Sequence, residues 1–494
     1  MELPLLVSFV AYLLMVTLIG VVAYTRTHNI DDYILGGRKL GAAVTALSVG
    51  ASDMSGWLLL GLPGAVYLSG LSEVWIGIGL VCGAYASWRL VSRRLRVYSH
   101  HARNSLTLPD YLENRFADRS HVLRVLSALV ILLFFTFYTA SGLVGGAILF
   151  ESSFGLDYRV ALSLGALVIV SYTFVGGFLA VSWTDALQAL LMLLALILTP
   201  LLVLRDAGGP GALSQQLREV NPASVSLFYG TSLAGIVSLL AWGLGYFGQP
   251  HILARFMAIE SPARLVAARR VAMSWMVIVL IGSVSTGLAG MAYFSEQPLD
   301  NPETVFIALS QTLFNPWVAG IISAAILSAI MSTIDSQLLV SSSVISEDFY
   351  RVFIRPGAGK KELLLVSRAA VIGIALVAVI IASDRDSRVL DLVSYAWAGF
   401  GASFGPVILF SLFWRQMTGL AAIAGMLSGA VTVVLWSSLE GGWFDLYEMV
   451  PGFAIASLVI GGVSRLAPQA DGEILAEFDQ VQALGSESQS RRSG

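Results

Sequence analysis

Long apolar stretches separated by short charged segments dominate this sequence. Because about 20 mostly apolar residues cross a bilayer, the pattern predicts an all-α, polytopic membrane protein with thirteen transmembrane helices. Eight stretches contain no Asp, Glu, Lys or Arg: 3–25, 125–150, 160–184, 186–204, 220–254, 271–295, 392–414 and 416–439. Three shorter stretches reach spanning length with their flanks, namely 74–88, 369–383 and 449–464. Two more hold one charge each, Asp53 within 40–72 and Asp335 within 304–346.

The distribution of positive charge predicts the orientation of these helices. Lys and Arg near helix ends tend to remain cytoplasmic, and thirteen spans place the two termini on opposite sides. With the N-terminus outside, all but five of the 29 Lys and Arg residues fall in cytoplasmic segments. We therefore expect a single transmembrane domain over 1–466, with its N-terminus outside, followed by a flexible cytoplasmic tail, 467–494.

Composition excludes several other classes of protein. Of 494 residues, 56% are hydrophobic and 12% are charged, which is too few charges to coat a water-soluble surface. A net charge of −3 gives no basic excess for binding nucleic acid. The single cysteine, Cys82, excludes an intrachain disulfide and is expected to be buried. The pattern GASFG at 401–405 lies inside a spanning segment, so neither an enzyme nor a cofactor is indicated.

The second predicted span is interrupted by small and polar residues. Asp53 lies between Ser52 and Ser55, beside Gly56. A carboxylate in mid-membrane costs about 2.5 to 3.5 kcal/mol and must meet a cation, a donor or water. Carbonyl oxygens freed by the interruption suit a small alkali cation. The alternative is a structural carboxylate bonded to neighbouring serine or backbone groups.

The seventh predicted span, 220–254, contains a second interruption. Three glycines between residues 243 and 248 precede Pro250, which removes a backbone donor and predicts a kinked or unwound stretch. Trp242 and Tyr246 lie one turn apart on one face just before it. They could bind a ligand, or they could be interfacial aromatic residues near the boundary marked by Arg255.

The ninth predicted span carries a stripe of small, oxygen-bearing side chains. Ala329, Ser332, Thr333 and Ser336 recur with helical spacing, so they share one face that could meet a cation. Ordinary close packing of small residues is the alternative explanation. Asp335 is expected toward the cytoplasmic half.

The two interrupted spans lie five helices apart. Inverted repeats of membrane transporters place the substrate between such broken helices. This favours a five-plus-five inverted repeat in which helices 2–6, residues 40–204, form the first half and helices 7–11, residues 220–414, form the second. Helices 1, 12 and 13 would be peripheral.

Five segments together resemble the sodium:solute symporter family, and within it the bacterial branch that transports proline. The resemblance runs from about Tyr33 to Tyr350 and implies a leucine-transporter-like fold. The segments are DDYILGGRKLG, SVGASDMSGWLLLGLPG, SYTFVGGFLAVSWTDALQA, AWGLGYFGQPHILARFMA and MSTIDSQLLVSSSVISEDFY.

The resemblance also implies roles for individual residues. A sodium site would use the carbonyls of Ala51, Met54 and Ala329 and the hydroxyls of Ser332 and Thr333, with Asp53 nearby. The proline pocket would be lined by Tyr138, Trp242, Tyr246 and Pro250, with Ser55, Gly56 and Trp57 at its edge. Four further residues match positions regarded as functionally sensitive in the family, although structural roles fit them equally well: Arg38, Glu73, Asp185 and Gln337. Asp335 lies at a position where some proline symporters carry an uncharged residue.

The resemblance implies Na+-coupled uptake of L-proline by alternating access across a bacterial cytoplasmic membrane, with Na+ as the coupling ion and residues 1–466 as a single transporter domain in the lipid bilayer. One alternative is a symporter of another small solute, such as a different amino acid or a carboxylate. Another is a membrane sensor built on a transporter-like domain, which would need a signalling domain longer than the 28-residue tail.

Overall fold

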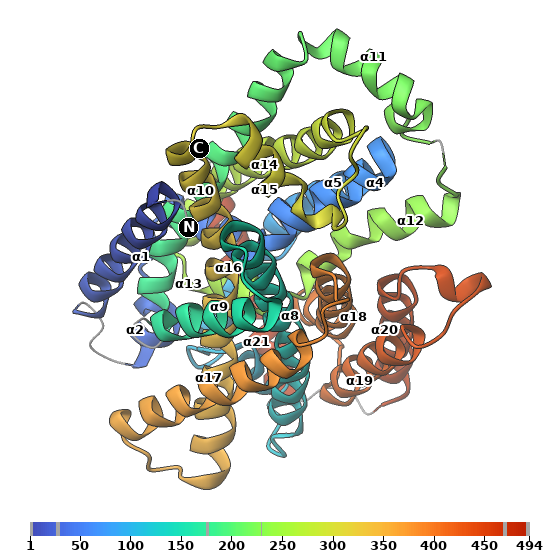
Figure 1. Cartoon of the computed structure of the whole chain (residues 1–494). Helices are drawn as coiled ribbons and strands as arrows, with labels where there is room; N and C mark the ends of the chain where they lie inside the picture. The colour runs from blue at the N-terminus through green and yellow to red at the C-terminus, as the bar shows by residue number, and fades with distance from the viewer. Residues whose placement is uncertain (1–2, 26–29, 174–176, 229, 468–471, 491–494) are drawn as a thin grey trace.

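The computed structural model describes residues 3–25, 30–173, 177–228, 230–467 and 472–490, most of which are helical (Figure 1). Among them no strand occurs, only an isolated bridge between Leu40 and Ile259. The α-helices are α1 (Leu3–Tyr24), α2 (Ile30–Leu35), α3 (Ala42–Asp53), α4 (Leu62–Ser69), α5 (Val74–Leu90), α6 (Ser92–His101), α7 (Leu108–Arg115), α8 (Val122–Phe154), α9 (Tyr158–Thr173), α10 (Phe178–Asp206), α11 (Pro210–Val220), α12 (Leu233–Ala241), α13 (Pro250–Ala258), α14 (Leu265–Tyr293), α15 (Val305–Leu313), α16 (Pro316–Ser343), α17 (Lys360–Ala382), α18 (Val389–Phe413), α19 (Gly419–Trp436), α20 (Met449–Leu466) and α21 (Gly472–Ser490).

Within the described residues, ten helical segments are long and apolar enough to cross a membrane. Two shorter apolar helices, Tyr158–Ser171 and Leu233–Phe247, fall within predicted spans as well. The prediction of an all-helical chain with many apolar spans is therefore confirmed.

Burial separates a central group of helices from a peripheral group. In α16 and α18, 83% of the most apolar window is buried inside the protein, whereas the figure is 28% for α1, α17 and α20. Figure 1 shows α1 and the packed pair α19–α20 on opposite sides of the bundle. The exposed leucine and valine side chains of the peripheral helices suit a lipid environment, because lipid tails are as apolar as they are.

The second predicted span is interrupted where its sequence indicated. Helix α3 ends at Asp53, and Met54 has a non-helical backbone with φ −84° and ψ 75°. A short π-helix, η2 (Trp57–Gly61), leads into α4. The predicted span is therefore divided into two helical parts with non-helical backbone between them.

The seventh predicted span is interrupted in the same way. Helix α12 passes into a 3-10 segment, η5 (Trp242–Phe247), and Pro250 begins α13 after an extended Gln249. The outer ends of the two interrupted elements are joined, because Leu40 accepts a hydrogen bond from Glu260 N (2.9 Å) and donates one to Ala258 O (3.4 Å). The start of the first element thus meets the end of the second.

Asp185 does not mark a boundary between two spans. Its charge divided the stretches 160–184 and 186–204, but α10 begins at Phe178 and Asp185 lies two turns inside it. The separation was misplaced because a buried, paired carboxylate is tolerated within a helix, so a charge is no reliable end marker.

Two further expectations differ from the structure. Cys82 is exposed on α5 rather than buried, because an apolar flank of a membrane helix can face lipid instead of the protein core. In place of a loosely ordered tail, Gly472–Ser490 form helix α21, whose Phe478 and Val481 are buried. Residues 468–471 and 491–494 of that tail lie outside the described residues.

Helix α5 and the interrupted segment η5 approach each other through glycines. A Cβ atom on Gly83 would lie 2.0 Å from the carbonyl oxygen of Gly243, and one on Gly79 would lie 2.4 Å from the carbonyl oxygen of Leu240. Any larger residue must push the two backbones apart. The pattern GLVCG at 79–83 is therefore a close-packing site.

We predict that Gly83→Ala destabilises the protein by about 1 to 3 kcal/mol, because the added methyl overpacks a backbone contact. Gly77→Ala is the matched control on the same helix, since its Cβ would have only Leu280 Cδ1 within reach, at 4.0 Å. Thermal unfolding of the purified protein checks this. Equal melting temperatures for the two variants would contradict the packing argument.

Candidate functional site

The two helix interruptions meet at Asp53. The Tyr246 hydroxyl donates to Asp53 Oδ2, while Tyr138 Oη and Trp57 Nε1 donate to the Asp53 carbonyl at 3.2 and 3.1 Å. Asp53 is 2% exposed, and within the described part of the chain its Oδ1 has no hydrogen-bond partner. The residue joins the end of α3, the segment η5 and helix α8, and it keeps one carboxylate oxygen unsatisfied.

Five aromatic side chains surround this junction and form what we call the aromatic group: Trp57, Trp242, Tyr246, Trp397 and Tyr447. The Trp242 ring lies 6.2 Å from that of Trp57 and stacks on that of Tyr447 at 5.6 Å. Trp397 of α18 lies edge-on to Tyr246 at 5.2 Å, and its Nε1 donates to the Trp242 carbonyl at 2.7 Å. Trp242 and Tyr246 are thus buried in the protein, and the alternative of an interfacial aromatic belt is excluded for them.

A cluster of neutral oxygens lies between α3 and α16. Ser332 Oγ is 2.7 Å from the carbonyl of Ala51 and 3.0 Å from that of Ala329. Thr333 Oγ1 is 3.4 Å from each of these two carbonyls. Met54 lies three residues after Ala51, and its non-helical ψ of 75° turns its carbonyl out of the hydrogen-bond pattern of the helix. Carbonyl oxygens of unwound segments are the ligands that coordinate Na+ in broken-helix transporters.

The remaining predicted pocket residues take different positions around the break. Ser55 Oγ accepts from Trp57 N at 3.4 Å. A Cβ on Gly56 would lie 3.0 Å from Ile330 Cγ1, so α16 packs directly on this turn. Pro250 lines a small, mostly apolar cavity with Leu339 and other residues of α7, α13 and α16, not the aromatic group.

Asp185 belongs to a buried polar network that ties four helices together. Arg255 Nη2 is 2.7 Å from Asp185 Oδ2 and 2.7 Å from Ser336 Oγ, and its Nε donates to Ser48 Oγ at 2.6 Å. Both members of the ion pair are at most 1% exposed. Ser48 lies one turn before Ser52 on α3 and Ser336 one turn after Ser332 on α16. The network therefore supports the two helices that carry the oxygen cluster.

The other secondary residues lie outside the aromatic group. Arg38 donates to the carbonyls of Met257 (2.6 Å) and Ser105 (2.7 Å), which fastens the end of α13 to the segment after α6. Gln337 Oε1 accepts from Thr139 at 3.2 Å. Glu73 is half-buried in the turn before α5. Asp335 is fully buried in α16.

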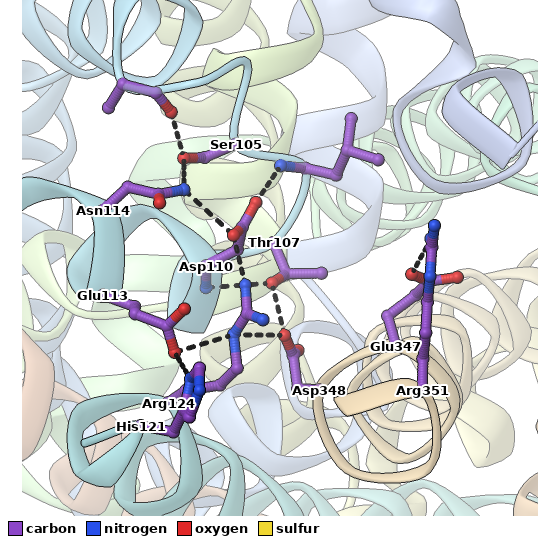
Figure 2. A network of polar contacts seen from close by, with 12 residues as sticks. Ser105, Thr107, Asp110, Glu113, Asn114, His121, Arg124, Glu347, Asp348 and Arg351 are labelled. Atoms are coloured by element: carbon purple, nitrogen blue, oxygen red, sulfur yellow. Dashed lines mark hydrogen bonds and ion pairs between the residues drawn. The ribbon is translucent and has the colours of Figure 1, made fainter. Parts of the chain in front are cut away.

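A second polar network connects α7, the start of α8 and the π-helix η8 (Val344–Ile354), as Figure 2 shows. Arg124 pairs with Asp110, and its Nε lies 3.3 Å from both Glu113 Oε2 and Asp348 Oδ1. Thr107 donates to Asp348 at 3.2 Å. The positive-charge distribution assigned Arg124 to membrane orientation only, because its partner Asp348 lies 224 residues away in the sequence.

The profile of the sodium:solute symporter family matches residues 33–429, which is most of the chain. The chain belongs to that family. A sodium/proline symporter of Escherichia coli K12 is 54% identical to this symporter over 97% of the chain and 96% of the relative. A high-affinity proline transporter, PutP, of Bacillus subtilis 168 is 52% identical over 94% of the chain and 98% of the relative.

Solved structures share the fold of this symporter. A Na+-coupled sialic acid symporter, in a substrate-bound outward-open state, superposes with a TM-score of 0.79 at 19% identity, covering 95% of this chain and 99% of that one. Mhp1, a nucleobase-cation-symport-1 family transporter, gives 0.59 at 13% identity, covering 92% and 100%. The relatives are secondary transporters rather than enzymes, and the chain is a multi-pass membrane protein.

Two sets of site residues were not identified from local sequence patterns. Trp397 and Tyr447 complete the aromatic group from α18 and the turn before α20, and Arg255 supplies the partner of Asp185. An isolated tryptophan in an apolar helix carries no signal of a site. Arg255 carried one, since an arginine next to a broken helix needs a partner, but it had been assigned to the membrane boundary.

We predict that Arg255→Gln destabilises the symporter by about 3 to 5 kcal/mol, because it leaves the buried Asp185 carboxylate without its cation. Adding Asp185→Asn should restore part of the loss. Arg264→Gln is the control, since its pair with Glu260 is 64% and 39% exposed and contributes about 0 to 1 kcal/mol. Thermal unfolding compares them, and equal shifts for Arg255→Gln and Arg264→Gln would refute the expectation.

Proposed function

We propose that this protein couples the entry of Na+ to the uptake of L-proline across a bacterial cytoplasmic membrane by alternating access. The observation that carries the proposal is the contact of an oxygen cluster with an aromatic group at two facing helix interruptions. Asp53 belongs to both, since it follows Ala51 by two residues and accepts from Tyr246. The names of relatives that are 52% and 54% identical over nearly the full length support proline as the substrate.

The proposed sodium site consists of the carbonyls of Ala51, Met54 and Ala329 with the hydroxyls of Ser332 and Thr333. Two of these carbonyls already lie within hydrogen-bond distance of the two hydroxyls. A small cation among them would accept lone pairs from all these oxygens, and the hydroxyl protons would turn outward. The charge of Asp53 nearby favours the cation electrostatically without having to be a ligand.

The proposed proline pocket lies against Tyr138, Trp242 and Tyr246. Aromatic faces provide apolar contact for a pyrrolidine ring, and backbone groups freed at the interruptions can meet the charged ends of the zwitterion. Ser55, Gly56 and Trp57 form the edge of this pocket on the α3 side. Pro250 acts from a greater distance, by starting α13 and thereby setting the position of η5.

We also propose a thirteen-helix, leucine-transporter-like arrangement for this chain, with its N-terminus outside and its C-terminus cytoplasmic. The first repeat would run over 40–204 and the second over 220–414. The interruption in the first helix of each proposed repeat supports this division. So does the joining of Leu40 to the end of α13, since two antiparallel elements bring those ends together.

The energy available from one Na+ is sufficient for concentrative uptake. Moving one charge through ~100 mV is worth about 2.3 kcal/mol, and a tenfold sodium gradient adds roughly 1.4 kcal/mol. Together these sustain a proline gradient of order several hundred-fold. Proline is zwitterionic at neutral pH, so each transport cycle would carry one net positive charge inward.

Replacing both hydroxyls, Ser332→Ala with Thr333→Ala, should raise the Na+ concentration for half-maximal proline binding by at least about tenfold, a loss of about 1.4 kcal/mol. Ser342→Ala is the matched control, because among the described residues the Ser342 hydroxyl donates only within its own helix, to Leu339 O. Binding of radiolabelled proline to purified protein across a sodium titration measures both. An unchanged sodium dependence in the double variant would remove the proposed site.

Truncating the aromatic group should affect proline itself. Trp242→Ala or Tyr246→Ala should weaken proline binding at saturating Na+ by about tenfold or more, whereas Asp53→Asn should mainly impair the sodium dependence. Because the two ligands are coupled, a smaller secondary shift is expected in each variant. Equilibrium binding over a grid of both concentrations separates the two effects. If proline affinity in Trp242→Ala and Tyr246→Ala stays within about twofold of wild type, these aromatic residues serve only in packing and do not bind the substrate.

A further inference from the structure

The C-terminal helix α21 is docked on the body of the protein by one face. Phe478 and Val481, three residues apart, are 5% and 4% exposed, whereas Leu484 is 47% exposed. The apolar pair therefore fixes the helix in a definite rotation. An amphipathic helix buries such a stripe only against a specific partner surface.

One side of that surface is helix α6. The Phe478 ring lies 6.4 Å from the ring of Tyr98 and 5.0 Å from the guanidinium carbon of Arg115, at the end of α7. Arg94 Nη1 donates to Gln482 Oε1 at 2.8 Å. These contacts hold α21 to the segment that follows α5.

The other side of the surface is the end of α18. Gln482 Nε2 donates to the Leu412 carbonyl at 3.1 Å, and Arg94 of α6 reaches the same carbonyl at 3.2 Å. Arg415, just after α18, forms a two-pronged ion pair with Asp479, with N–O distances of 2.8 and 2.9 Å. Helix α21 thus reinforces a junction between two elements that are 318 residues apart in sequence at Arg94 and Leu412.

Both bridged elements lead to the proposed substrate pocket. Helix α6 packs against α13, and Arg96 Nε donates to the Ile259 carbonyl at its end, at 2.8 Å. Helix α13 is the second half of the element that carries Trp242 and Tyr246. Helix α18 carries Trp397, whose ring meets Tyr246. In the proposed division, α6 belongs to the first repeat and α18 to the second.

We propose that α21 is a cytoplasmic strap across α6 and α18 that restrains opening of the pocket toward the cytoplasm. The proposal rests on the alternating-access function proposed above, in which one group of helices rocks against the other. A helix bonded to both groups resists that movement. Its ion pair is about half exposed on each side, so it is weak and screened by salt. The strap can therefore release and re-form during transport.

The test measures access to the small cavity at the start of α13. Ser343 lines that cavity together with Pro250 and Leu339. Ser343→Cys, in a background with Cys82→Ser, provides a reporter for labelling by a membrane-impermeant maleimide in inside-out vesicles. This doubly substituted chain is the parent of the variants below, and its labelling is measured without proline and Na+. Proline uptake by the wild-type chain is recorded in parallel.

Phe478→Asp, and separately a chain ending at residue 471, should raise the labelling rate of the thiol introduced at position 343 by about threefold or more, because the inward-open state gains population. Leu484→Asp is the matched control on the exposed face of α21 and should stay within about 1.5-fold of the parent. Arg415→Asp should also raise labelling at low salt, and Arg415→Asp with Asp479→Arg should reverse that rise.

Labelling rates that stay at the parent level in Phe478→Asp and in the truncated chain would overturn the strap. So would an equal rise in Leu484→Asp, or a charge swap that fails to reverse the effect of Arg415→Asp. The swap also guards against misfolding, since a merely destabilised protein would not recover. If the variants raise labelling as expected but the wild-type chain takes up no proline, the proposed function is refuted and the strap stands.

Discussion

Backbone polar groups inside an apolar bundle must find partners, and the two helix interruptions create several that have none in their own helix. The structure satisfies them with side chains from other helices. The carbonyl of Asp53 accepts from Tyr138 and Trp57, that of Trp242 accepts from Trp397, and that of Ala51 lies against Ser332. The same contacts that stabilise the breaks assemble the candidate site.

This arrangement explains why sodium and substrate should influence each other. Ala51 and Asp53 lie within one turn of α3, one at the oxygen cluster and the other at Tyr246. At the proposed sodium site, a cation would fix the end of α3 and with it Asp53, the partner of Tyr246, so each ligand would favour the same local arrangement. Coupling of this kind is reciprocal in free energy. The Arg255–Asp185 pair holds α3 and α16 in register behind the site.

Much of this organisation could be predicted from short stretches of sequence. The apolar segments, the break beside Asp53, the break before Pro250 and the oxygen-bearing stripe on α16 all follow from local composition, because helix-breaking residues and helical spacing act within a few residues. The resemblance to the sodium:solute symporter family supplied the residue roles that local patterns left open. Helix boundaries were less secure, as Asp185 inside α10 demonstrates.

The sequence by itself determined that the chain is an all-helical membrane protein with two interrupted helices and a hydroxyl-lined one. Only the tertiary structure decided which groups meet. Trp397 and Tyr447 reach Trp242 from segments 155 and 205 residues away, Arg255 reaches Asp185 across 70, and α21 docks on α6 and the end of α18. Such contacts depend on how helices pack, and no local pattern of a single tryptophan or a polar tail specifies its partner.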